Sequence, residues 1–364
     1  MTETNVTKKR KWPYVLLAVV LAFSLIIGIA YAFVESMLAY NYKEIDTTPE
    51  ILGFETIKDD RIINIALFGL DTRSVESFEG RSDTIMVLSV NNGNGKVKVI
   101  SVMRDSLVPI DKKYGRTYNK INNAYASGGP ELAIKTLNTM FDLDISEYVS
   151  INFYKLAQVI DLVGGVEIDV TEGEISQINA CLGEICDGLG KESQDYKITK
   201  SGKQHLNGIQ AVAFSRIRYT ATVSGTNNDY GRTDRQRIVM GQLFKKALAM
   251  PKVEYLKLVK PILSSCESSL TYTEVVDVAI NILSNNSGFS EARVPMTDYI
   301  MPSPSAGVGS VVYYDINFAA KLINSFIYDD ITPQSYIEKN GVEKYDWYNK
   351  GFVAPKISHE EKGE

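Results

Sequence analysis

The sequence gathers arginine into one short segment of an otherwise acidic chain. Five arginines and a glutamine lie between Arg216 and Arg237, whereas the formal net charge of the whole chain is −5. A guanidinium is always charged and presents a planar fork of donors that suits phosphate oxygens. Because the positive charge is local, we expect a site for a phosphate-rich anion here rather than a surface for nucleic acid.

Two of these arginines fall in an apolar run, AVAFSRIRY (211–219), which we interpret as a β-strand. Alternate residues of a strand project from the same face, so Arg216 and Arg218 are expected to point into one space. The alternative is a pair of surface arginines with acidic partners at similar spacing, and none occurs within the run. The pattern therefore favours a shared anion site.

The run DYGRTDRQR (229–237) precedes a helix predicted over residues 238–250. Free backbone N–H groups and the positive end of the helix dipole favour an anion at such a point. The side chains expected to add to this effect are Arg232, Arg235 and Gln236. Two roles are open for Asp229, which could orient an arginine or accept a proton.

Carboxylates and further arginines cluster at predicted strand ends. Asp71 closes one strand in GLDTR, and Asp83 opens the next in GRSDT. Two carboxylates together with phosphate oxygens make a site that suits Mg²⁺, with Mn²⁺ as an alternative ion. The competing interpretation is that Asp71 caps a turn while Asp83 pairs with Arg81. Arg81 and Arg104 lie beside these carboxylates and are expected to bring positive charge to the same cleft.

Histidine and cysteine are too scarce for several common chemistries. With only His205 and His359, the chain has little from which to build a histidine-rich zinc site or a Ser-His-Asp triad. Cys181 and Cys186 bracket a predicted loop, CLGEIC, and either close a small disulfide ring or remain free thiols. Cys266 is expected to be a small buried side chain. Any catalysis is therefore expected from carboxylates, arginines and a hard metal ion.

Predicted strands and helices alternate along the chain. IINIALFGLD (62–71) is expected as a buried strand, and residues 83–105 as a β-hairpin around the turn NNGNG. Residues 128–141 are expected to be helical from Pro130 onward, and residues 152–170 to form a helix, a Gly-Gly break and a strand. Further helices are expected over 234–249, 272–284 and 315–327. This order predicts an α/β fold with a mixed central β-sheet sandwiched between helices.

The N-terminal region predicts a membrane anchor. An uncharged apolar stretch over residues 12–34 is long enough, as a helix, to cross a hydrocarbon core of about 30 Å. The basic residues before it place the N-terminus inside the cell. A cleaved signal peptide is the alternative, because Ala30-Tyr31-Ala32 fits a cleavage motif, but its apolar core would be shorter. We therefore expect a single-pass cell-membrane protein with a cytoplasmic tail (1–11), a transmembrane helix (12–34), a stalk (35–60), an extracellular domain (61–335) and a C-terminal tail (336–364).

Taken in order, the motifs resemble those of the LytR-CpsA-Psr family of Gram-positive cell envelopes. The matching segments are GLDTR, GRSDT, SVMRD, KINNAYASGG, LVGGVEIDV, QHLNGIQAVAFSRIRY and DYGRTDRQ, and they cover residues 61–255. The resemblance implies an α-β-α domain that acts outside the membrane as a ligase or phosphotransferase. Such enzymes take an anionic glycopolymer from a polyprenyl pyrophosphate carrier and attach it to peptidoglycan through a phosphodiester.

The resemblance also implies roles for individual residues. Asp71 and Asp83 would hold Mg²⁺ against the pyrophosphate, and Asp229 would position or deprotonate a reacting group. The pyrophosphate oxygens would be bound by Arg81, Arg104, Arg216, Arg218, Arg232, Arg235 and Gln236. The residues expected to act in catalysis are Asp71, Asp83, Arg104, Asp229 and Arg232. The long loop after Arg218 and the CLGEIC segment depart from the family pattern and bear on polymer or acceptor preference.

Two other functions fit the same residues: a pyrophosphatase of lipid-linked intermediates, or a non-catalytic regulator that binds an envelope polymer. The polymer (teichoic acid, capsule or another wall glycan) and the acceptor hydroxyl leave no motif. A polyprenyl tail needs an apolar slot, which the helices at 130–141 and 153–163 are expected to line. In that case a charge at Leu137 or Ile160 would abolish lipid binding. The alternative is that these helix faces belong to the core.

Overall fold

The computed structural model describes residues 40–110, 118–285, 288–304 and 307–344. Within these ranges, no helix is both long enough and apolar enough to cross a membrane. The segment predicted as an anchor, residues 12–34, lies outside the described residues.

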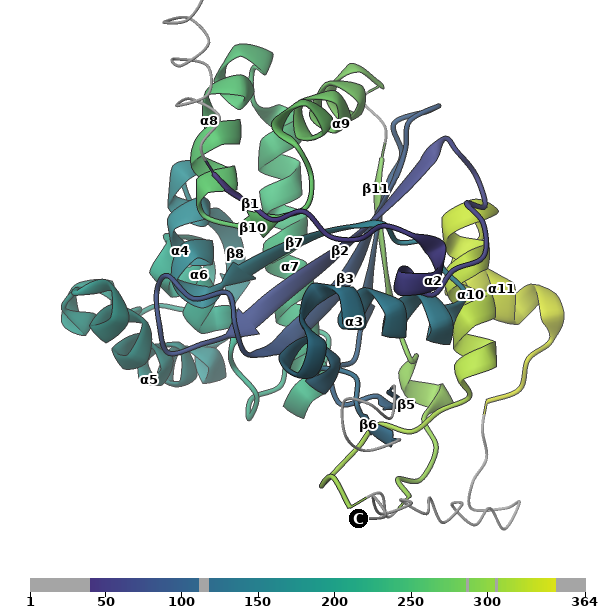
Figure 1. Ribbon diagram of the computed structural model, residues 1–364. Coiled ribbons are helices and arrows are strands. Elements are labelled where there is room, and N and C mark those ends of the chain that lie inside the picture. Colours follow the sequence, from purple (N-terminus) through teal and green to yellow (C-terminus); the bar gives the residue numbers. More distant parts are fainter. Residues whose placement is uncertain (1–39, 111–117, 286–287, 305–306, 345–364) are drawn as a thin grey trace, which may run out of the picture. The chain divides into compact units, whose positions relative to one another are not determined.

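A seven-stranded mixed sheet forms the middle layer of the domain (Figure 1), in the order β1-β10-β7-β2-β3-β4-β11. Its strands are β1 (Asn41–Tyr42), β2 (Ile62–Asp71), β3 (Arg81–Asn91), β4 (Val97–Val102), β7 (Glu147–Asn152), β10 (Glu267–Ser268) and β11 (Phe289–Val294). β2 pairs antiparallel with β3 and parallel with β7, while β3 and β4 form an antiparallel hairpin. The predicted strand at 62–71, the hairpin and the mixed sheet are therefore confirmed.

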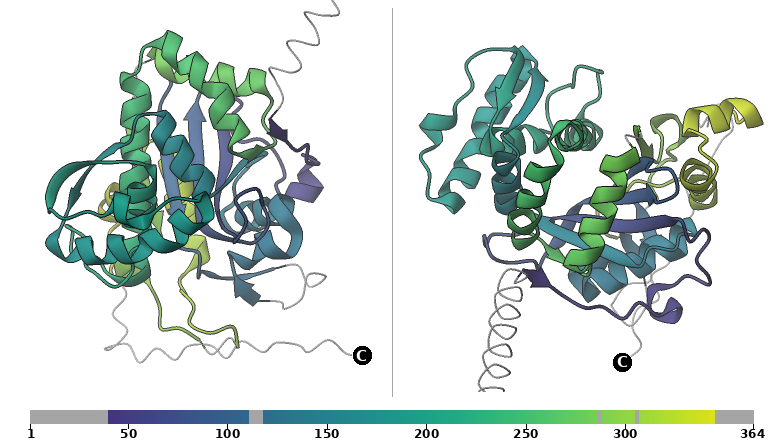
Figure 2. Two further views of the ribbon diagram at one scale, coloured as in Figure 1. Left: turned by 90° about the vertical axis from the view of Figure 1, so that its left-hand side faces the viewer. Right: turned by 90° about the horizontal axis from the view of Figure 1, so that it is seen from above.

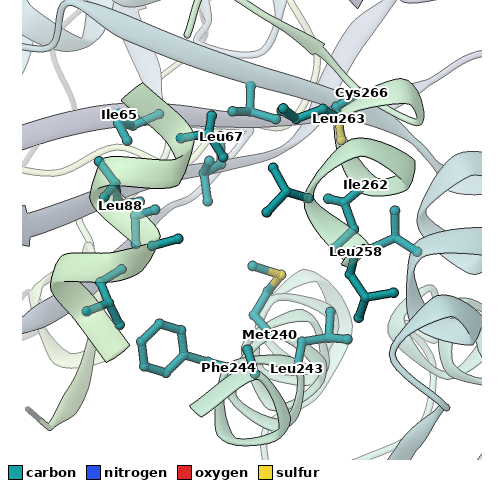
Figure 3. A pocket seen from close by; sticks show the side chains of 18 of the residues that line it. Ile65, Leu67, Leu88, Met240, Leu243, Phe244, Leu258, Ile262, Leu263 and Cys266 are labelled. Carbon is teal, nitrogen blue, oxygen red and sulfur yellow. The ribbon is translucent and has the colours of Figure 1, made fainter. Parts of the chain in front are cut away.

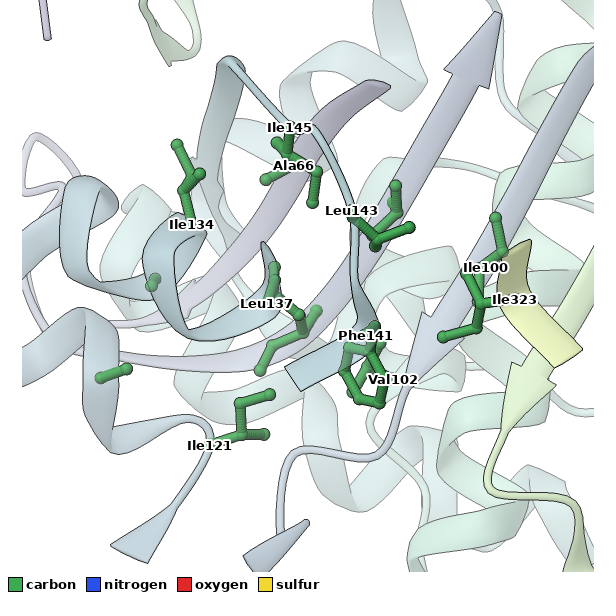
Figure 4. Packing of buried hydrophobic residues seen from close by; sticks show 14 of the residues in the cluster. Ala66, Ile100, Val102, Ile121, Ile134, Leu137, Phe141, Leu143, Ile145 and Ile323 are labelled. Carbon is green, nitrogen blue, oxygen red and sulfur yellow. The ribbon is translucent and has the colours of Figure 1, made fainter. Parts of the chain in front are cut away.

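One face of the sheet carries the larger hydrophobic core. Its helices are α2 (Pro49–Leu52), α3 (Asn123–Phe141) and α10 (Ile316–Tyr328), whereas α11 (Pro333–Asn340) packs against α10 in a separate small cluster. Leu137 and Phe141 of α3 meet Ile323 of α10 and Ala66 of β2 in this core (Figure 4). Leu52, which was expected in a stalk, is fully buried there as well. Part of the predicted stalk therefore belongs to the folded domain.

The other face is covered by α4 (Phe153–Leu162), α7 (Asn228–Ala249), α8 (Lys252–Ser264) and α9 (Tyr272–Asn285), so the sheet lies between two helical layers (Figures 1 and 2). Residues of β2 alternate between the faces, as the two-residue period of a strand requires. Ala66 and Leu70 enter the core beside α3, whereas Ile65 and Leu67 point toward α7, α8 and α9. This second side of the sheet is less completely filled.

A smaller unit extends from the α4 side of the sheet. It contains β8 (Val166–Val170), α5 (Glu172–Leu189), η2 (Ser193–Tyr196), β9 (Gly202–Leu206) and α6 (Gly208–Ser215). β8 and β9 pair antiparallel, and their apolar side chains share a cluster with α4, α5 and α6. A second hairpin, β5 (Leu107–Pro109) with β6 (Tyr118–Lys120), follows β4. The smaller unit includes CLGEIC and the first part of the run 211–219, two segments for which the sequence predicted another structure.

The prediction of a strand over residues 211–219 is wrong. The first part of this segment belongs to α6, which ends at Ser215 and has Arg216 as its C-terminal capping residue. A capping box starts this helix: Asn207 Oδ1 accepts a hydrogen bond from the Gln210 backbone N–H at 3.0 Å, and Gln210 Oε1 accepts one from the Asn207 N–H at 3.1 Å. Such reciprocal bonds satisfy N–H groups that a helix start leaves free.

Two further predictions about local structure need correction. CLGEIC lies inside α5 rather than in a loop, and Cys181 and Cys186 are both free thiols. Helix α7 begins at Asn228, before both of the predicted starts, residues 234 and 238. The arginines of this segment are therefore helical residues and cannot act as groups placed before a helix N-terminus.

Candidate active site

A polar cavity of about 270 Å³ lies where β2 ends and β3 begins, against α4, α5, α7 and the segment that follows α6. It is lined by Asp71, Asp83, Phe153, Ala180, Cys181, Glu184, Arg216, Arg218, Arg232 and Gln236. Six of the predicted site residues are among them. The structure thus brings the carboxylates after β2 and the arginines after α6 to one place, although they lie far apart in the sequence.

Local structure explains how each side chain reaches the cavity. Asp71 is the last residue of β2, and Asp83 is the third residue of the antiparallel neighbour β3. Arg216 caps the end of α6, and Arg218 follows it by two residues. Arg232 and Gln236 lie four residues apart on α7 and therefore share one face of that helix.

Two aspartates and three arginines form a continuous ionic network at the cavity. Asp83 Oδ2 accepts a short hydrogen bond from Arg104 Nη1 and lies 3.6 Å from Arg232 Nη1 and 3.9 Å from Arg218 Nη2. Asp229 Oδ1 faces the same three guanidiniums, at 3.0 Å from Arg232 Nη2, 3.4 Å from Arg104 Nη2 and 3.9 Å from Arg218 Nε. Each aspartate therefore holds all three arginines in place.

Burial affects the two inner arginines of this network differently. Burial alone would lower the pKa of Arg104, but the nearby carboxylates of Asp83, Asp229 and Asp105 outweigh it and raise that pKa. Burial lowers the pKa of Arg232 to about 10, opposed by Asp229 and reinforced by the like charges of Arg104 and Arg218. A pKa of about 10 still leaves the Arg232 guanidinium charged at neutral pH. Both arginines are thus permanent cations on the buried side of the site.

A second ionic group forms the wall contributed by α5. Glu184 Oε2 accepts a hydrogen bond from Arg216 Nη2 at 2.8 Å, and its Oε1 accepts one from Arg73 Nη1 at 2.5 Å. The Arg216 guanidinium also stacks over the Phe153 ring, 4.7 Å from its centroid. Glu184, Cys181 and Phe153 were not predicted as site residues. Glu184 and Cys181 were missed because CLGEIC was expected to be a loop, whereas it is part of α5, and one face of this helix brings both side chains to the cavity.

Four predicted site residues do not line the cavity. Arg104 and Asp229 are not among the lining residues, but they contact Asp83, Arg218 and Arg232 through the network described above. Arg81 is exposed at the start of β3, opposite Asp71 in the strand ladder. Arg235 is fully buried and bonded to Glu174, with Nε to Oε1 at 2.7 Å. The expectation that Arg235 binds phosphate is thus contradicted by its placement.

The donor set of the cavity fits a hard divalent cation only together with ligands from a substrate. Among the described residues, no group of three or more histidine, cysteine, aspartate or glutamate side chains is arranged to hold a metal. Asp71 and Asp83 supply two carboxylates, a number that suits Mg²⁺ when phosphate oxygens and water complete its shell. The cavity is lined by three carboxylates and three guanidiniums, so their formal charges cancel. A bound pyrophosphate would therefore need additional positive charge, which such an ion supplies.

Two apolar cavities lie next to the polar one, along α7. A cavity of about 200 Å³ shares Phe153 and Gln236 with the polar cavity. A larger one of about 340 Å³, between the sheet and α7, α8 and α9, is lined mainly by aliphatic side chains, with Phe244, Phe289 and Cys266 among them (Figure 3). The two apolar cavities share Leu67, Val149, Val159, Met240, Leu243 and Cys266. A polar compartment and an apolar compartment thus meet at Phe153 and Gln236.

Only one of the two helices predicted to line an apolar slot lines these cavities. Helix α4 does line them through Val159, but Ile160 faces the cluster shared with α5 and α6. Leu137 lies in the core on the opposite face of the sheet (Figure 4). Cys266 is a small buried side chain, as expected, and burial raises its pKa to about 12. A thiol with this pKa is protonated at neutral pH and is a poor nucleophile.

A charged cavity beside apolar cavities, at one face of a helix-flanked mixed sheet, is a combination that suits an amphiphilic anion. The chain belongs to the LytR_cpsA_psr family, whose model matches residues 30–320. The resemblance seen in the motifs is thereby confirmed.

Individual relatives agree with this family. The chain is 31% identical over 258 residues to "Biofilm regulatory protein A" of Streptococcus mutans, covering 68% of this chain and 58% of that protein. It is also 31% identical to the "Polyisoprenyl-teichoic acid--peptidoglycan teichoic acid transferase TagU" of Enterococcus faecalis, covering 60% of this chain and 65% of the relative. The chain thus spans less than two thirds of the length of either protein.

Solved structures share the fold. Bacillus subtilis TagV superposes with a TM-score of 0.56 at 21% identity, covering 74% of this chain and 98% of TagV. A TagT structure with bound octaprenyl pyrophosphate lipid superposes with a TM-score of 0.51 at 22% identity, covering 79% of this chain and 93% of TagT. These similarities confirm the α/β architecture with a mixed sheet flanked by helices.

Proposed function

We propose that this protein is a phosphotransferase that moves an anionic glycopolymer from a polyprenyl pyrophosphate carrier to peptidoglycan through a phosphodiester bond. The observation that carries the proposal is the junction of the charged and apolar cavities at Phe153 and Gln236. A lipid pyrophosphate has the same two parts in the same order. The name of the TagU relative and the lipid bound in the TagT structure support the same substrate class.

The residues of the polar cavity have distinct roles in this reaction. Arg218, Arg232 and Gln236 bind the pyrophosphate oxygens, and the network of Asp83, Asp229 and Arg104 holds these arginines in place. The three guanidiniums around Asp229 favour its orienting role over that of a base. Fixed positive groups around the pyrophosphate stabilise the charge that develops on the leaving phosphate as an acceptor hydroxyl attacks phosphorus.

Asp71 and Asp83 would hold Mg²⁺, or Mn²⁺ in its place, against the pyrophosphate. When bound, this ion would neutralise part of the pyrophosphate charge and stabilise the leaving group. We place the protein at the cell membrane, anchored by residues 12–34 with its catalytic domain outside, because its carrier lipid is a membrane component and its acceptor is the cell wall. The proposed polymer is an anionic wall glycan, and the proposed acceptor is a hydroxyl group of peptidoglycan.

Removing one cavity arginine tests the ligand class. Arg218→Ala is expected to weaken binding of geranylgeranyl pyrophosphate about tenfold to hundredfold, because hydrogen bonds to a charged group contribute roughly 1.5–3 kcal/mol. Calorimetric titration in the presence of Mg²⁺ measures the change. Arg61→Ala is the matched control, since Arg61 is an exposed arginine just before the opposite end of β2 and does not line the cavity. Equal losses in the two variants would rule out a specific role for the cavity.

Neutralising a cavity carboxylate separates a catalyst from a binder. Asp71→Asn is expected to lower transfer to peptidoglycan by about a hundredfold or more, the typical cost of losing one preorganised group that stabilises transition-state charge. The melting temperature should stay unchanged, because Asp71 is exposed at the strand end. Asp60→Asn, just before the opposite end of β2, is the control. Full turnover in Asp71→Asn would remove Asp71 from the catalytic machinery. A wild type that binds the lipid pyrophosphate but transfers nothing would indicate a non-catalytic module, and product released only as free phosphate would indicate a pyrophosphatase.

A further inference from the structure

Glu184 is an acidic side chain inside a site that should bind a pyrophosphate. It lines the polar cavity and its Oε2 accepts a hydrogen bond from Arg216 Nη2 at 2.8 Å. A carboxylate and a phosphoryl group present similar oxygen acceptors to a guanidinium, so they compete for the same donors. In this structure, Glu184 therefore stands where a phosphoryl oxygen would bind Arg216.

Arg216 is separate from the other cavity arginines in its ionic contacts. Arg218 and Arg232 share the carboxylates of Asp83 and Asp229, whereas Arg216 pairs with Glu184 and stacks on Phe153. The cavity thus contains two cationic positions with separate carboxylate partners. A pyrophosphate has two phosphoryl groups and can engage both positions, whereas a monophosphate has only one.

Arg73 gives Glu184 a second partner that does not line the cavity. Glu184 Oε1 accepts a hydrogen bond from Arg73 Nη1 at 2.5 Å, on the carboxylate oxygen not used by Arg216. The Arg73 side chain is 81% exposed, and the Glu184 side chain is 36% exposed. Glu184 can therefore release Arg216 while keeping both Arg73 and solvent as partners, so that release does not leave a buried unpaired charge.

Resting on the proposed function, we infer that Glu184 is a built-in competitor for the second phosphoryl group of a pyrophosphate. It occupies Arg216 when the site is empty or holds only a monophosphate, and it yields Arg216 when a pyrophosphate binds. The carboxylate thus sets how strongly the site prefers the pyrophosphate-linked donor to the polyprenyl monophosphate that remains after transfer. It also prevents the donor from being held so tightly that turnover is slowed.

The test compares two short-chain probes, geranylgeranyl pyrophosphate and geranylgeranyl monophosphate, titrated into wild type and Glu184→Gln with Mg²⁺ present. The inference predicts that Glu184→Gln binds the pyrophosphate about tenfold more tightly, since a competing charge-assisted hydrogen bond has been removed. Affinity for the monophosphate should change much less, and this probe measures the general effect of removing one negative charge. The decisive quantity is the dissociation constant for the monophosphate divided by that for the pyrophosphate, which should rise in Glu184→Gln.

Two further variants locate the effect. Glu76→Gln is the matched control, because Glu76 is an exposed glutamate that pairs with Lys155 and does not line the cavity; its ratio should equal that of wild type. Arg73→Ala should weaken pyrophosphate binding, because Glu184 then has fewer partners to exchange for Arg216. This loss should shrink when Arg73→Ala is combined with Glu184→Gln, as coupled residues in a double-mutant cycle do.

The outcomes are distinguishable. An unchanged ratio in Glu184→Gln, or weaker pyrophosphate binding because Glu184 only positions Arg216, overturns the inference and leaves the proposed function standing. If wild type binds neither probe, the proposed function fails and the inference fails with it. A ratio raised in Glu184→Gln alone among the single glutamate variants supports both.

Discussion

Replacing Arg235 with alanine is expected to lower the free energy of unfolding by about 3–5 kcal/mol, the usual cost of removing one partner from a buried ion pair. Arg235 and Glu174 have side-chain exposures of 0% and 1%. Without the guanidinium, the carboxylate of Glu174 would be left buried without its countercharge. Chemical denaturation of the domain measures the loss.

Arg235 also fixes the backbone that carries Arg218. Its Nη1 donates to the Ile217 carbonyl at 3.3 Å and its Nη2 donates to the Thr220 carbonyl at 2.7 Å. These two carbonyls flank Arg218 in the chain. We therefore expect Arg235→Ala to weaken binding of geranylgeranyl pyrophosphate as a consequence of lost structure, in the fraction of protein that remains folded.

Lys245→Ala is the control for this prediction, because Lys245 is an exposed cation on the same helix. Its effect on stability should stay within about 0.5 kcal/mol, as for most surface substitutions. A variant Arg235→Ala that unfolds like wild type but no longer binds the pyrophosphate would contradict the structural role. In that case Arg235 would be a ligand, as the sequence suggested.

The case of Arg235 shows what sequence reasoning could not decide. Arg232 and Arg235 belong to the same run and have the same chemistry, so charge alone does not separate them. Their directions depend on where α7 begins. Because the helix starts at Asn228, both residues are already helical, and residues three apart differ in direction enough for one to line the cavity and the other to enter the interior.

The prediction of a strand over residues 211–219 was wrong for a related reason. Its alternating pattern is compatible with a strand, and its apolar residues are equally compatible with a buried helix, since short apolar runs do not separate the two by periodicity. The capping box formed by Asn207 and Gln210 was the signal that favours a helix. Arg216 and Arg218 nevertheless share the cavity, because the chain turns after Ser215 and both lie in the connection that follows α6.

Predictions that depended on strong local patterns were confirmed. The strand at 62–71 has the predicted bounds, and the β3–β4 hairpin follows from β-rich runs around Gly- and Asn-rich residues. Asp71 and Asp83 meet because adjacent antiparallel strands bring the end of one beside the start of the next. Glu184 had no comparable signal, since a single glutamate in a helix is ordinary until tertiary packing places it opposite Arg216.

The largest effect on ligand binding is expected from a charge in the apolar cavities. Met240 of α7 lines both of them, and Figure 3 shows its side chain at the larger one. Met240→Lys should weaken binding of geranylgeranyl pyrophosphate by more than about a hundredfold, because a prenyl chain packed there would bury an ammonium group without a partner. Binding of inorganic pyrophosphate with Mg²⁺ should be retained, since the polar cavity is unchanged.

Ile238→Lys provides a matched control on the same helix. Ile238 is 39% exposed and lines neither apolar cavity, so its replacement should leave binding of the lipid probe intact. Leu137→Lys tests the corrected position of the slot. Because Leu137 lies in the core across the sheet, this variant should unfold the domain instead of selectively losing lipid.

Full lipid binding by a folded Met240→Lys protein would mean that the prenyl chain does not enter these cavities. The charged cavity would then recognise the head group alone, and the size of the apolar space would need another explanation.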